Sequence, residues 1–280
     1  MTAVARSLHR DEPAPWVIDD YLALPFAGAE GSAILGRLRS EVPGDLLVAF
    51  NRWVCVRARL PEDMAEQAAT EGFRQYVILG AGLDSFAYRR HDLLKRLRVF
   101  EVDHPASQAW KQARLAELGV ECPANLVFAP VDFETQTLRD GLEAAGFDFE
   151  KPALFSWIGV TMYLTIGAIE ATLATVASCP PGTRIVLTYN LPSSALRGGG
   201  LHTRNLLEKL ATEMGEPFVS LFEPAEAEAL LRRLGFDDIA HFGPAEAIHA
   251  YFGDRDDVRL HGAQRLITAK VASGHVVGHV

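Results

Sequence analysis

The sequence predicts an α/β fold of the Rossmann-like class, with a mostly parallel seven-stranded sheet. Three observations carry this prediction. Short apolar runs alternate with helix-like patterns from about residue 75 onward, the first run ends in a pair of glycines, and the second ends in an aspartate. Alternation of this kind is typical of βαβ units, whose parallel sheet is covered by helices on both faces. Glycines after one strand and an acidic residue about 20 positions later are typical of nucleoside-binding sheets.

The expected strands follow one another along the chain and are separated by helical or turn-forming segments. They cover Tyr76–Leu79, Val99–Val102, Leu126–Val131, Ala153–Trp157, Arg184–Tyr189, Phe236–His241 and Arg265–Val271. Helices are expected at Pro105–Leu118, Leu138–Ala145, Ile166–Ser178, Leu201–Met214 and Ala225–Leu234. Gly215 and Gly235 follow the last two helices, where glycine commonly ends a helix. Right-handed crossovers between the parallel strands then leave few possible strand orders.

The first 70 residues differ from the rest because they lack strand alternation. We expect residues 1–70 to form a helical cap, with helices at Leu46–Leu60 and Glu62–Thr70. Residues 71–280 are expected to form the Rossmann-like domain, in one structural unit with the cap, and to carry a substrate lid at 191–223. Within that insertion, Ser193–Gly200 is rich in Ser and Gly and is predicted to be a flexible loop.

The composition suits a globular protein with a sizeable core, since 49% of the 280 residues are hydrophobic. The 27 basic and 36 acidic residues give a formal charge of −9, which disfavours nucleic acid as a partner. We find no secretion signal in residues 1–15 and no apolar run that could span a bilayer. The isolated cysteines Cys55, Cys122 and Cys179 fit reduced thiols in a cytoplasmic protein, and no metal site is expected.

The glycine turn, Gly80-Ala81-Gly82, carries the first functional signal. Glycine has no Cβ, so a ligand can lie directly against the backbone here. A pyrophosphate site would normally have a third glycine and a free helix N-terminus, but this chain has Ser85, and Asp84 opens the helix. A carboxylate there repels phosphate and favours a positively charged nucleoside such as S-adenosylmethionine. Alternatively, Asp84 is only a helix cap.

Two further carboxylates follow the second and third expected strands. Asp103 is placed to accept hydrogen bonds from a ribose, and Asp132 from an adenine amino group. Phe133, next to Asp132, is a further candidate for binding the cofactor. For both aspartates the alternative is a structural role as a helix cap or turn residue.

Arginines upstream of the glycine turn offer a partner for the carboxylate of the cofactor. Arg57 and Arg59 lie in a helical segment, and a guanidinium can bind a carboxylate with two parallel hydrogen bonds. The spacing alone would equally fit a solvated helix face.

The residues that would bind the methyl acceptor are less determined. Tyr163, Tyr189, Asn190 and His202 lie at or after strand ends, where open α/β sheets bind ligands. The tyrosines are also typical of core or rim aromatics, and His202 of a loop histidine. Methyl transfer depends mainly on orientation, and a carboxylate or phenolate acceptor needs little or no base, whereas a neutral hydroxyl needs one.

Taken together, the motifs resemble the leucine carboxyl methyltransferase family. The resemblance is closest to its bacterial branch, which includes polyketide O-methyltransferases. It rests on these segments, which cover nearly the whole chain: Arg57–Arg59, Leu79–Asp84, Phe100–Pro105, Pro130–Phe133, Phe155–Leu164, Gly215–Phe218 and Leu230–Phe236. The combination is specific, whereas the glycine turn alone would be weak.

The resemblance implies a class I methyltransferase fold with S-adenosylmethionine as cofactor. It implies that Arg57 binds the cofactor carboxylate, that Gly80 lies against the cofactor, that Asp103 binds the ribose and that Asp132 lies near the adenine. One position departs from the family, because Ile158 stands where many members have a Glu that contacts the cofactor. The ammonium group of the cofactor must then find another partner, such as a backbone carbonyl.

We therefore predict an S-adenosylmethionine-dependent O-methyltransferase that acts on a carboxylate or hydroxyl of a small molecule, such as a natural-product or polyketide intermediate. Two alternatives remain at this stage. An NAD-dependent oxidoreductase is disfavoured by the missing third glycine and by Asp84. A non-catalytic cofactor-binding module is kept open by Ile158.

Overall fold

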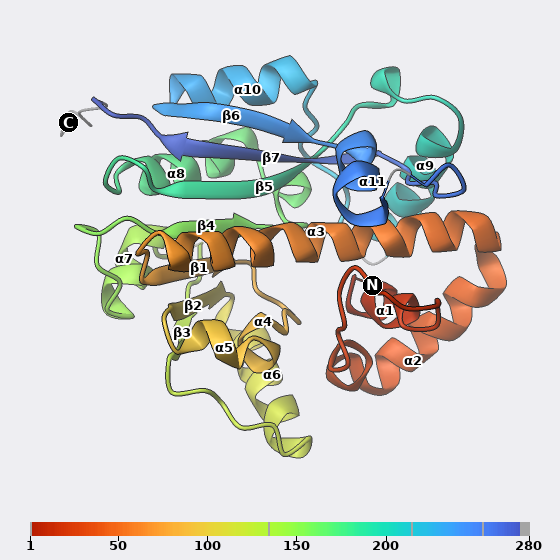
Figure 1. Ribbon diagram of the computed structural model, residues 1–280, viewed down its shortest axis with the longest axis horizontal. Coiled ribbons are helices and arrows are strands. Elements are labelled where there is room, and N and C mark those ends of the chain that lie inside the picture. Colours follow the sequence, from red (N-terminus) through yellow and green to blue (C-terminus); the bar gives the residue numbers. More distant parts are fainter. Residues whose placement is uncertain (1, 134, 214, 254, 275–280) are drawn as a thin grey trace.

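The computed structural model of the chain describes residues 2–133, 135–213, 215–253 and 255–274. A seven-stranded sheet runs through it in the order β3-β2-β1-β4-β5-β7-β6 (Figure 1). The strands are β1 (Gln75–Leu79), β2 (Arg98–Asp103), β3 (Leu126–Pro130), β4 (Leu154–Trp157), β5 (Arg184–Asn190), β6 (Phe236–Phe242) and β7 (Gln264–Val271). Only β7 runs antiparallel to its neighbours. The predicted fold class is confirmed.

Register places the ends of the central strands at one edge of the sheet. Leu79, the last residue of β1, lies opposite Val102 of β2 and Trp157 of β4. Every residue of β1 and β4 is buried, as expected for strands covered on both faces. The loops that leave these strands, including the glycine turn, therefore emerge side by side.

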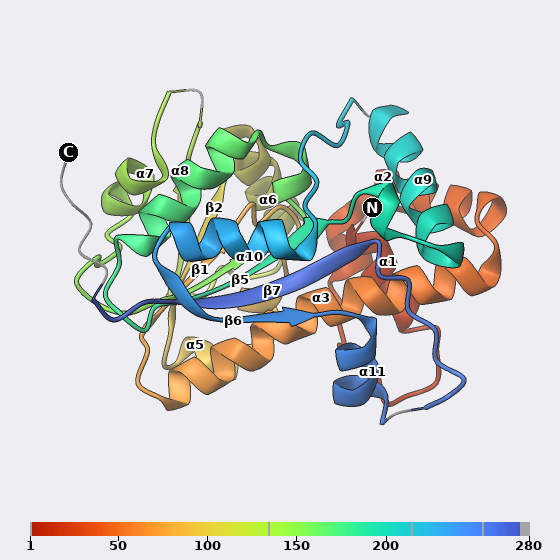
Figure 2. The same ribbon diagram turned by 90° about the horizontal axis from the view of Figure 1, so that it is seen from above.

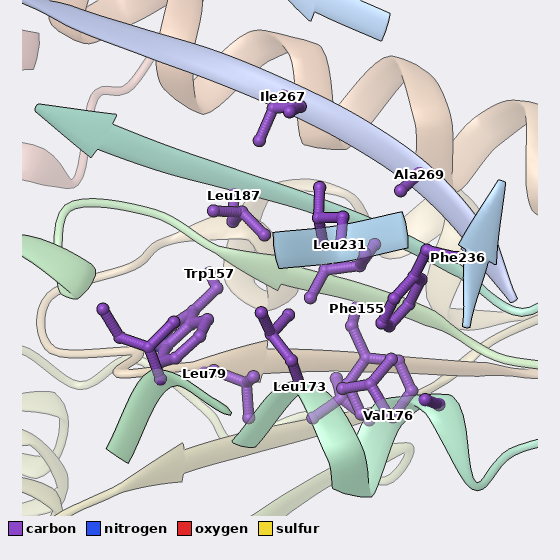
Figure 3. Packing of buried hydrophobic residues seen from close by; sticks show 14 of the residues in the cluster. Leu79, Phe155, Trp157, Leu173, Val176, Leu187, Leu231, Phe236, Ile267 and Ala269 are labelled. Carbon is purple, nitrogen blue, oxygen red and sulfur yellow. The ribbon is translucent and has the colours of Figure 1, made fainter. Parts of the chain in front are cut away.

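Helices cover both faces of the sheet (Figure 2). One face carries α7 (Leu138–Ala144), α8 (Ile166–Ala177) and α10 (Pro224–Arg233), and the other carries α4 (Phe86–Arg89), α5 (His91–Leu94), α6 (Pro105–Glu117) and part of α3. Figure 3 shows the first layer, in which Leu173 of α8 and Leu231 of α10 pack on Phe155 and Trp157 of β4. Burial of such side chains stabilises the layer by roughly 1.5–3 kcal/mol each.

Three helices precede the sheet: α1 (Thr2–His9), α2 (Ala23–Glu41) and α3 (Gly44–Thr70). The prediction of two helices on either side of Pro61 is wrong, since α3 runs through it without a break. Packing on both sides overrides the proline: Trp53 and Val54 are buried near the N-terminal helices, and Ala65 and Ala68 are buried near the sheet. This one helix spans from α1 and α2 to β1 (Figure 1).

The glycine-rich segment after β5 also differs from the prediction. Ser193–Ala195 forms a 3-10 turn, and α9 (Gly198–Glu213) begins inside the glycine run that was expected to be a loop. Gly199 lies so close to the His261 ring that a Cβ would collide with it. Glycine is thus required at position 199 by close packing against His261, and not by the flexibility of a loop. The predicted end of this helix, Met214, lies outside the described residues.

The last helix, α11 (Pro244–Phe252), joins β6 to the long segment before β7. It packs near α3 and β6, with Ala247 fully buried. None of the helices in the described ranges is long and apolar enough to cross a membrane.

Candidate cofactor and acceptor sites

The glycine turn is fixed to the end of β2 by its backbone. The amides of Gly80 and Ala81 both donate to the carbonyl of Val102, at 2.8 and 3.1 Å. Gly80 has φ of +64°, and a Cβ on it would overlap the side chain of Val160. Glycine is therefore required at position 80 by the backbone conformation and by the close approach of the chain after β4.

Asp103 lies beside this turn. Its Oδ2 accepts from the amide of Gly82 at 2.5 Å, and its Oδ1 accepts from the amide of His104 at 2.7 Å. A carboxylate has about four lone-pair sites, so acceptor capacity is left for ligand hydroxyls. Asp84 accepts a hydrogen bond from the amide of Phe86 at 2.7 Å and also lines the cavity beside the turn, so its capping role leaves it within reach of that cavity.

Asp132 and Phe133 follow β3 at the same edge, because Pro130 lies opposite Asp103. The side chain of Phe133 is 59% exposed, which is unusual for a large apolar group. Neither residue, nor Asp103, lines either of the two cavities described below. The structure places all three along the open strand ends next to the turn.

A cavity of about 150 Å³ lies on the other side of the turn. Its walls come from α1 (Thr2, Arg6), α3 (Val54, Arg57, Ala58, Pro61, Glu62), β1 and the turn after it (Tyr76, Ile78, Leu79, 80–84), Phe86 of α4, and the end of β4 with the chain after it (Ser156, Ile158, Gly159, Val160). Ile158 contributes an apolar surface where a Glu would have carried charge. The carboxylates that line this cavity are those of Glu62 and Asp84.

Arg57 projects from α3 between two cavities, and it is only 7% exposed. Among the described residues it has no ion pair, and its Nε has no hydrogen-bond partner. Burial lowers the pKa of Arg57 to about 10, which still leaves it charged at neutral pH. An unpaired buried charge is costly, and a ligand carboxylate would offset that cost.

Arg59 differs from Arg57 in every respect that matters for binding. Its Nε donates to Asp63 at 2.6 Å, and its side chain is 37% exposed. It lines neither cavity. Arg59, two positions after the buried Arg57, is therefore the arginine that lies on a solvated face of the helix.

The second cavity, of about 80 Å³, adjoins the first. Both are lined by Thr2, Arg57 and Gly159. The other residues that line it are Phe50, Trp53, Met162, Tyr163, Asn190, Thr203, Arg204, Ala211, Phe218, His261, Ala263 and Gln264. We call this space the acceptor cavity, after the role proposed for it below.

The structure brings only part of the predicted acceptor set together. Tyr163 and Asn190 line the acceptor cavity. Tyr189 is 1% exposed and bonds to Nδ1 of His241 at 2.9 Å, so it belongs to the core. His202 is exposed and lines neither cavity.

His261 lines the acceptor cavity, and it was not among the residues predicted from the sequence. It lies in the irregular segment between α11 and β7, where no periodicity marks a site. Burial lowers the pKa of His261, so it is neutral at pH 7. The feature that reveals it is its close contact with Gly199, which exists only in the folded chain.

Glu101 and Lys111 form a buried pair beneath the turn. Nζ of Lys111 donates to Glu101 at 2.6 Å and to the carbonyl of Asp84 at 2.8 Å. Burial raises the pKa of Glu101 to about 7, and Lys111 opposes that rise. Neither residue lines the cavity, and Lys111, which lies on α6, supports the turn through its bond to Asp84.

Helix α1 is connected to the turn by a charged network. Arg6 donates to Asp20 at 2.6 Å and to the carbonyl of Leu83 at 2.8 Å. Ser85 donates to the same carboxylate at 2.7 Å. These contacts hold α1 against the glycine turn.

No group of His, Cys, Asp and Glu that could hold a metal ion occurs in the described ranges. His275 and His279, four positions apart in the sequence, lie outside the described ranges.

Comparison with known proteins identifies the family. The sequence pattern of the leucine carboxyl methyltransferases matches residues 1–177. The chain belongs to the leucine carboxyl methyltransferase family. YktD of Bacillus subtilis (strain 168), provisionally named an S-adenosyl-L-methionine-dependent methyltransferase, is 30% identical over 92% of this chain and 91% of its own length. A Mycobacterium avium (strain 104) protein with the same provisional name is 38% identical over 65% of this chain and 60% of its own length.

Solved structures support the fold of this leucine carboxyl methyltransferase. A provisionally described methyltransferase from Thermobifida fusca YX aligns with a TM-score of 0.64 at 15% identity, over 98% of this chain and 95% of the other. Magnesium protoporphyrin IX methyltransferase from Synechocystis PCC 6803, solved with bound S-adenosylhomocysteine, aligns with a TM-score of 0.50 at 12% identity, over 90% and 98% of the two chains. The protein is an S-adenosylmethionine-dependent methyltransferase.

Proposed function

We propose that this methyltransferase transfers the methyl group to an oxygen of a small molecule bound in the acceptor cavity. The observation that carries the proposal is the junction of the two cavities at Arg57 and Gly159. A cofactor beside the turn and an acceptor in the second cavity would meet there. Proximity and orientation supply most of the rate in such a reaction.

The residues present fit S-adenosylmethionine. Arg57 would bind its carboxylate, and Gly80, Ala81 and Gly82 would lie along its amino-acid part. Asp103 would accept from the ribose hydroxyls. The open strand end with Asp132 and Phe133 would hold the adenine, whose flat ring suits an exposed aromatic side chain. When bound, the cofactor supplies a methyl group on a positively charged sulfur.

The acceptor cavity supports an oxygen acceptor in two ways. Its cationic groups stabilise a carboxylate or phenolate, which needs no base. For a neutral hydroxyl, the neutral imidazole of His261 is available to take the proton. Tyr163 also lines the cavity, but burial raises the pKa of this phenol, so it remains protonated at neutral pH and acts as a donor.

The surrounding elements would exclude water. Residues 1–70 would act as the cap, since α1 covers the turn through Arg6 and α3 carries Arg57. The 191–223 segment would act as the lid, since α9 supplies Thr203 and Arg204 to the acceptor cavity. Because the bacterial branch that the chain resembles includes polyketide enzymes, natural-product acids and phenols are the first acceptors to test.

The test has two separate measurements. Calorimetry should give micromolar binding of S-adenosylhomocysteine, about −7 to −8 kcal/mol. A screen with methyl-labelled cofactor should then give labelled products from small acids or phenols but not from amines of the same shape. Products from amines alone, or cofactor binding without turnover of any acid or phenol, would contradict the oxygen-acceptor proposal.

A further inference from the structure

The acceptor cavity is cationic. Arg57 and Arg204 both line it, and no Asp or Glu is among the described residues that do. Its histidine is neutral. The first cavity, which we call the cofactor cavity, differs, because Arg6 and Arg57 line it together with the carboxylates of Glu62 and Asp84. The acceptor cavity thus favours an anion, and the cofactor cavity a group of mixed charge.

Arg204 is buried but incompletely paired. It is 3% exposed and lies on α9. Its Nη1 makes long contacts to the carbonyl of Leu191 at 3.5 Å and to Ser193 at 3.4 Å, and its Nη2 donates to Glu208 at 3.1 Å. Glu208 is 44% exposed at its side chain, so water screens much of its charge. Nε of Arg204 has no hydrogen-bond partner among the described residues.

Other polar atoms around the same cavity are also buried without a described partner. They are Nε1 of Trp53, Oγ1 of Thr203, Nε of Arg57 and Oε1 of Gln264. Leaving a buried polar group unsatisfied costs about 1–3 kcal/mol. With Arg204, donors outnumber acceptors in this set. A ligand rich in acceptor oxygens would satisfy them.

The remaining wall is apolar and largely aromatic. Phe50, Trp53, Tyr163 and Phe218 line the cavity together with Met162. The rings of Tyr163 and Phe218 are 5.9 Å apart, and the guanidinium of Arg204 is 5.5 Å from the Phe218 ring centre. Such walls suit a flat apolar body, and the arginine is held in place by its contact with the ring.

We propose that Arg204 selects the methyl acceptor by binding an anionic group on it, so that the acceptor is a small, flat organic acid. This inference rests on the proposed function, in which this cavity holds the acceptor. Arg57 serves the cofactor carboxylate, and Arg204 is then the arginine left for the acceptor. A planar guanidinium matches a carboxylate in geometry as well as in charge.

The proposal can be tested with a matched pair of probes, benzoate and its neutral analogue benzamide. Both are titrated by calorimetry into protein saturated with S-adenosylhomocysteine. The wild type should bind benzoate at least about tenfold more tightly than benzamide, the range expected for a charge-assisted hydrogen bond. Arg204→Gln should remove that preference, whereas Arg233→Gln, which removes an exposed arginine paired with Glu170, should keep it.

Each outcome decides the matter. Equal binding of the two probes to the wild type, no benzoate binding at millimolar concentration, or an unchanged preference in Arg204→Gln would overturn the proposal. The wild-type comparison stands even if the variant does not fold. If benzoate weakens S-adenosylhomocysteine binding, it occupies the site at Arg57, and the assignment to Arg204 is wrong. Failure of S-adenosylhomocysteine to bind at all would instead count against the proposed cofactor site.

Discussion

The guanidinium of Arg57 lies against the backbone of Gly159, where a Cβ would be 2.9 Å from Nη2. This approach joins α3 to the chain that leaves β4. It also marks the point that both cavities share. The position of the arginine is therefore set by a glycine about 100 residues later in the chain.

Replacing Gly159 with Ala should weaken cofactor binding. The residue has φ of +76°, so alanine is strained there by about 1–2 kcal/mol, and its methyl group would displace Arg57. We expect a several-fold loss of S-adenosylhomocysteine affinity in calorimetry and a lower Tm. Gly167→Ala is the control, because Gly167 lies in α8 with open space around it, and alanine there should be neutral or stabilising. Similar effects of the two changes would contradict the proposed contact.

Arg57→Lys should lose most of the cofactor affinity, while Arg59→Lys should keep most of it. An ammonium is a point donor and cannot replace a planar fork that binds a carboxylate through two bonds. Helix propensity is nearly the same for the two residues, so α3 should survive both changes. Calorimetry with S-adenosylhomocysteine measures the difference. Near-native affinities in both variants would leave the carboxylate partner unidentified.

Asp103→Ala should weaken cofactor binding by about 1.5–3 kcal/mol, the value of hydrogen bonds to a charged acceptor. The turn also loses the bond from the Gly82 amide, so Asp103→Asn, which keeps an acceptor oxygen, separates the two effects. The exposed Asp11, paired with Arg39, provides the control Asp11→Ala. Wild-type affinity in Asp103→Ala would exclude a role at the ribose.

The pH dependence of folding should report the buried pair beneath the turn. The pKa of Glu101 is raised by burial from 4.5 to about 7, so the folded state holds a proton that the unfolded state releases. The contribution of the Glu101 carboxyl to the free energy of unfolding is fully present below pH 4.5, and it is lost as the pH rises through about 7. The slope for one such group is at most about 1.4 kcal/mol per pH unit.

Glu101→Gln removes this titration. We expect the free energy of unfolding of the wild type, measured by urea at several pH values, to fall relative to the variant across that interval. Parallel profiles for the two proteins would show that Glu101 does not exchange its proton on unfolding. Lys111→Met, which leaves the carboxyl without its partner, should destabilise the protein more above pH 7 than below it, because only the charged form of Glu101 needs the ammonium group.

The sheet was predictable because each central strand is a continuous apolar run bounded by turn residues. Leu79 and Gly80 mark such a boundary directly in the sequence. Arg57 and Arg59 could not be separated by spacing, because burial depends on what packs against the helix. Only the resemblance to the family favoured Arg57.

The acceptor cavity could not be predicted as a set. Trp53, Tyr163, Arg204 and His261 come from segments far apart in the chain and meet only after folding. The glycine run at 198–200 was misjudged for a related reason. Low helix propensity indicated a loop, while contact with His261 requires the missing side chain at Gly199.

Pro61 removes one backbone hydrogen bond from the middle of α3. Proline has no N–H, so the carbonyl of Arg57, one turn earlier, receives no hydrogen bond from position 61. Beyond it, Ala65 and Ala68 are fully buried in the cluster that includes β1 and stay with the sheet. The helix thus lacks one backbone hydrogen bond directly beside the cavity that Arg57 and the glycine turn line. If α3 bent at this position, Arg57 and the helices before it would move as one body relative to the glycine turn, because Ala65 and Ala68 hold the rest of the helix on the sheet.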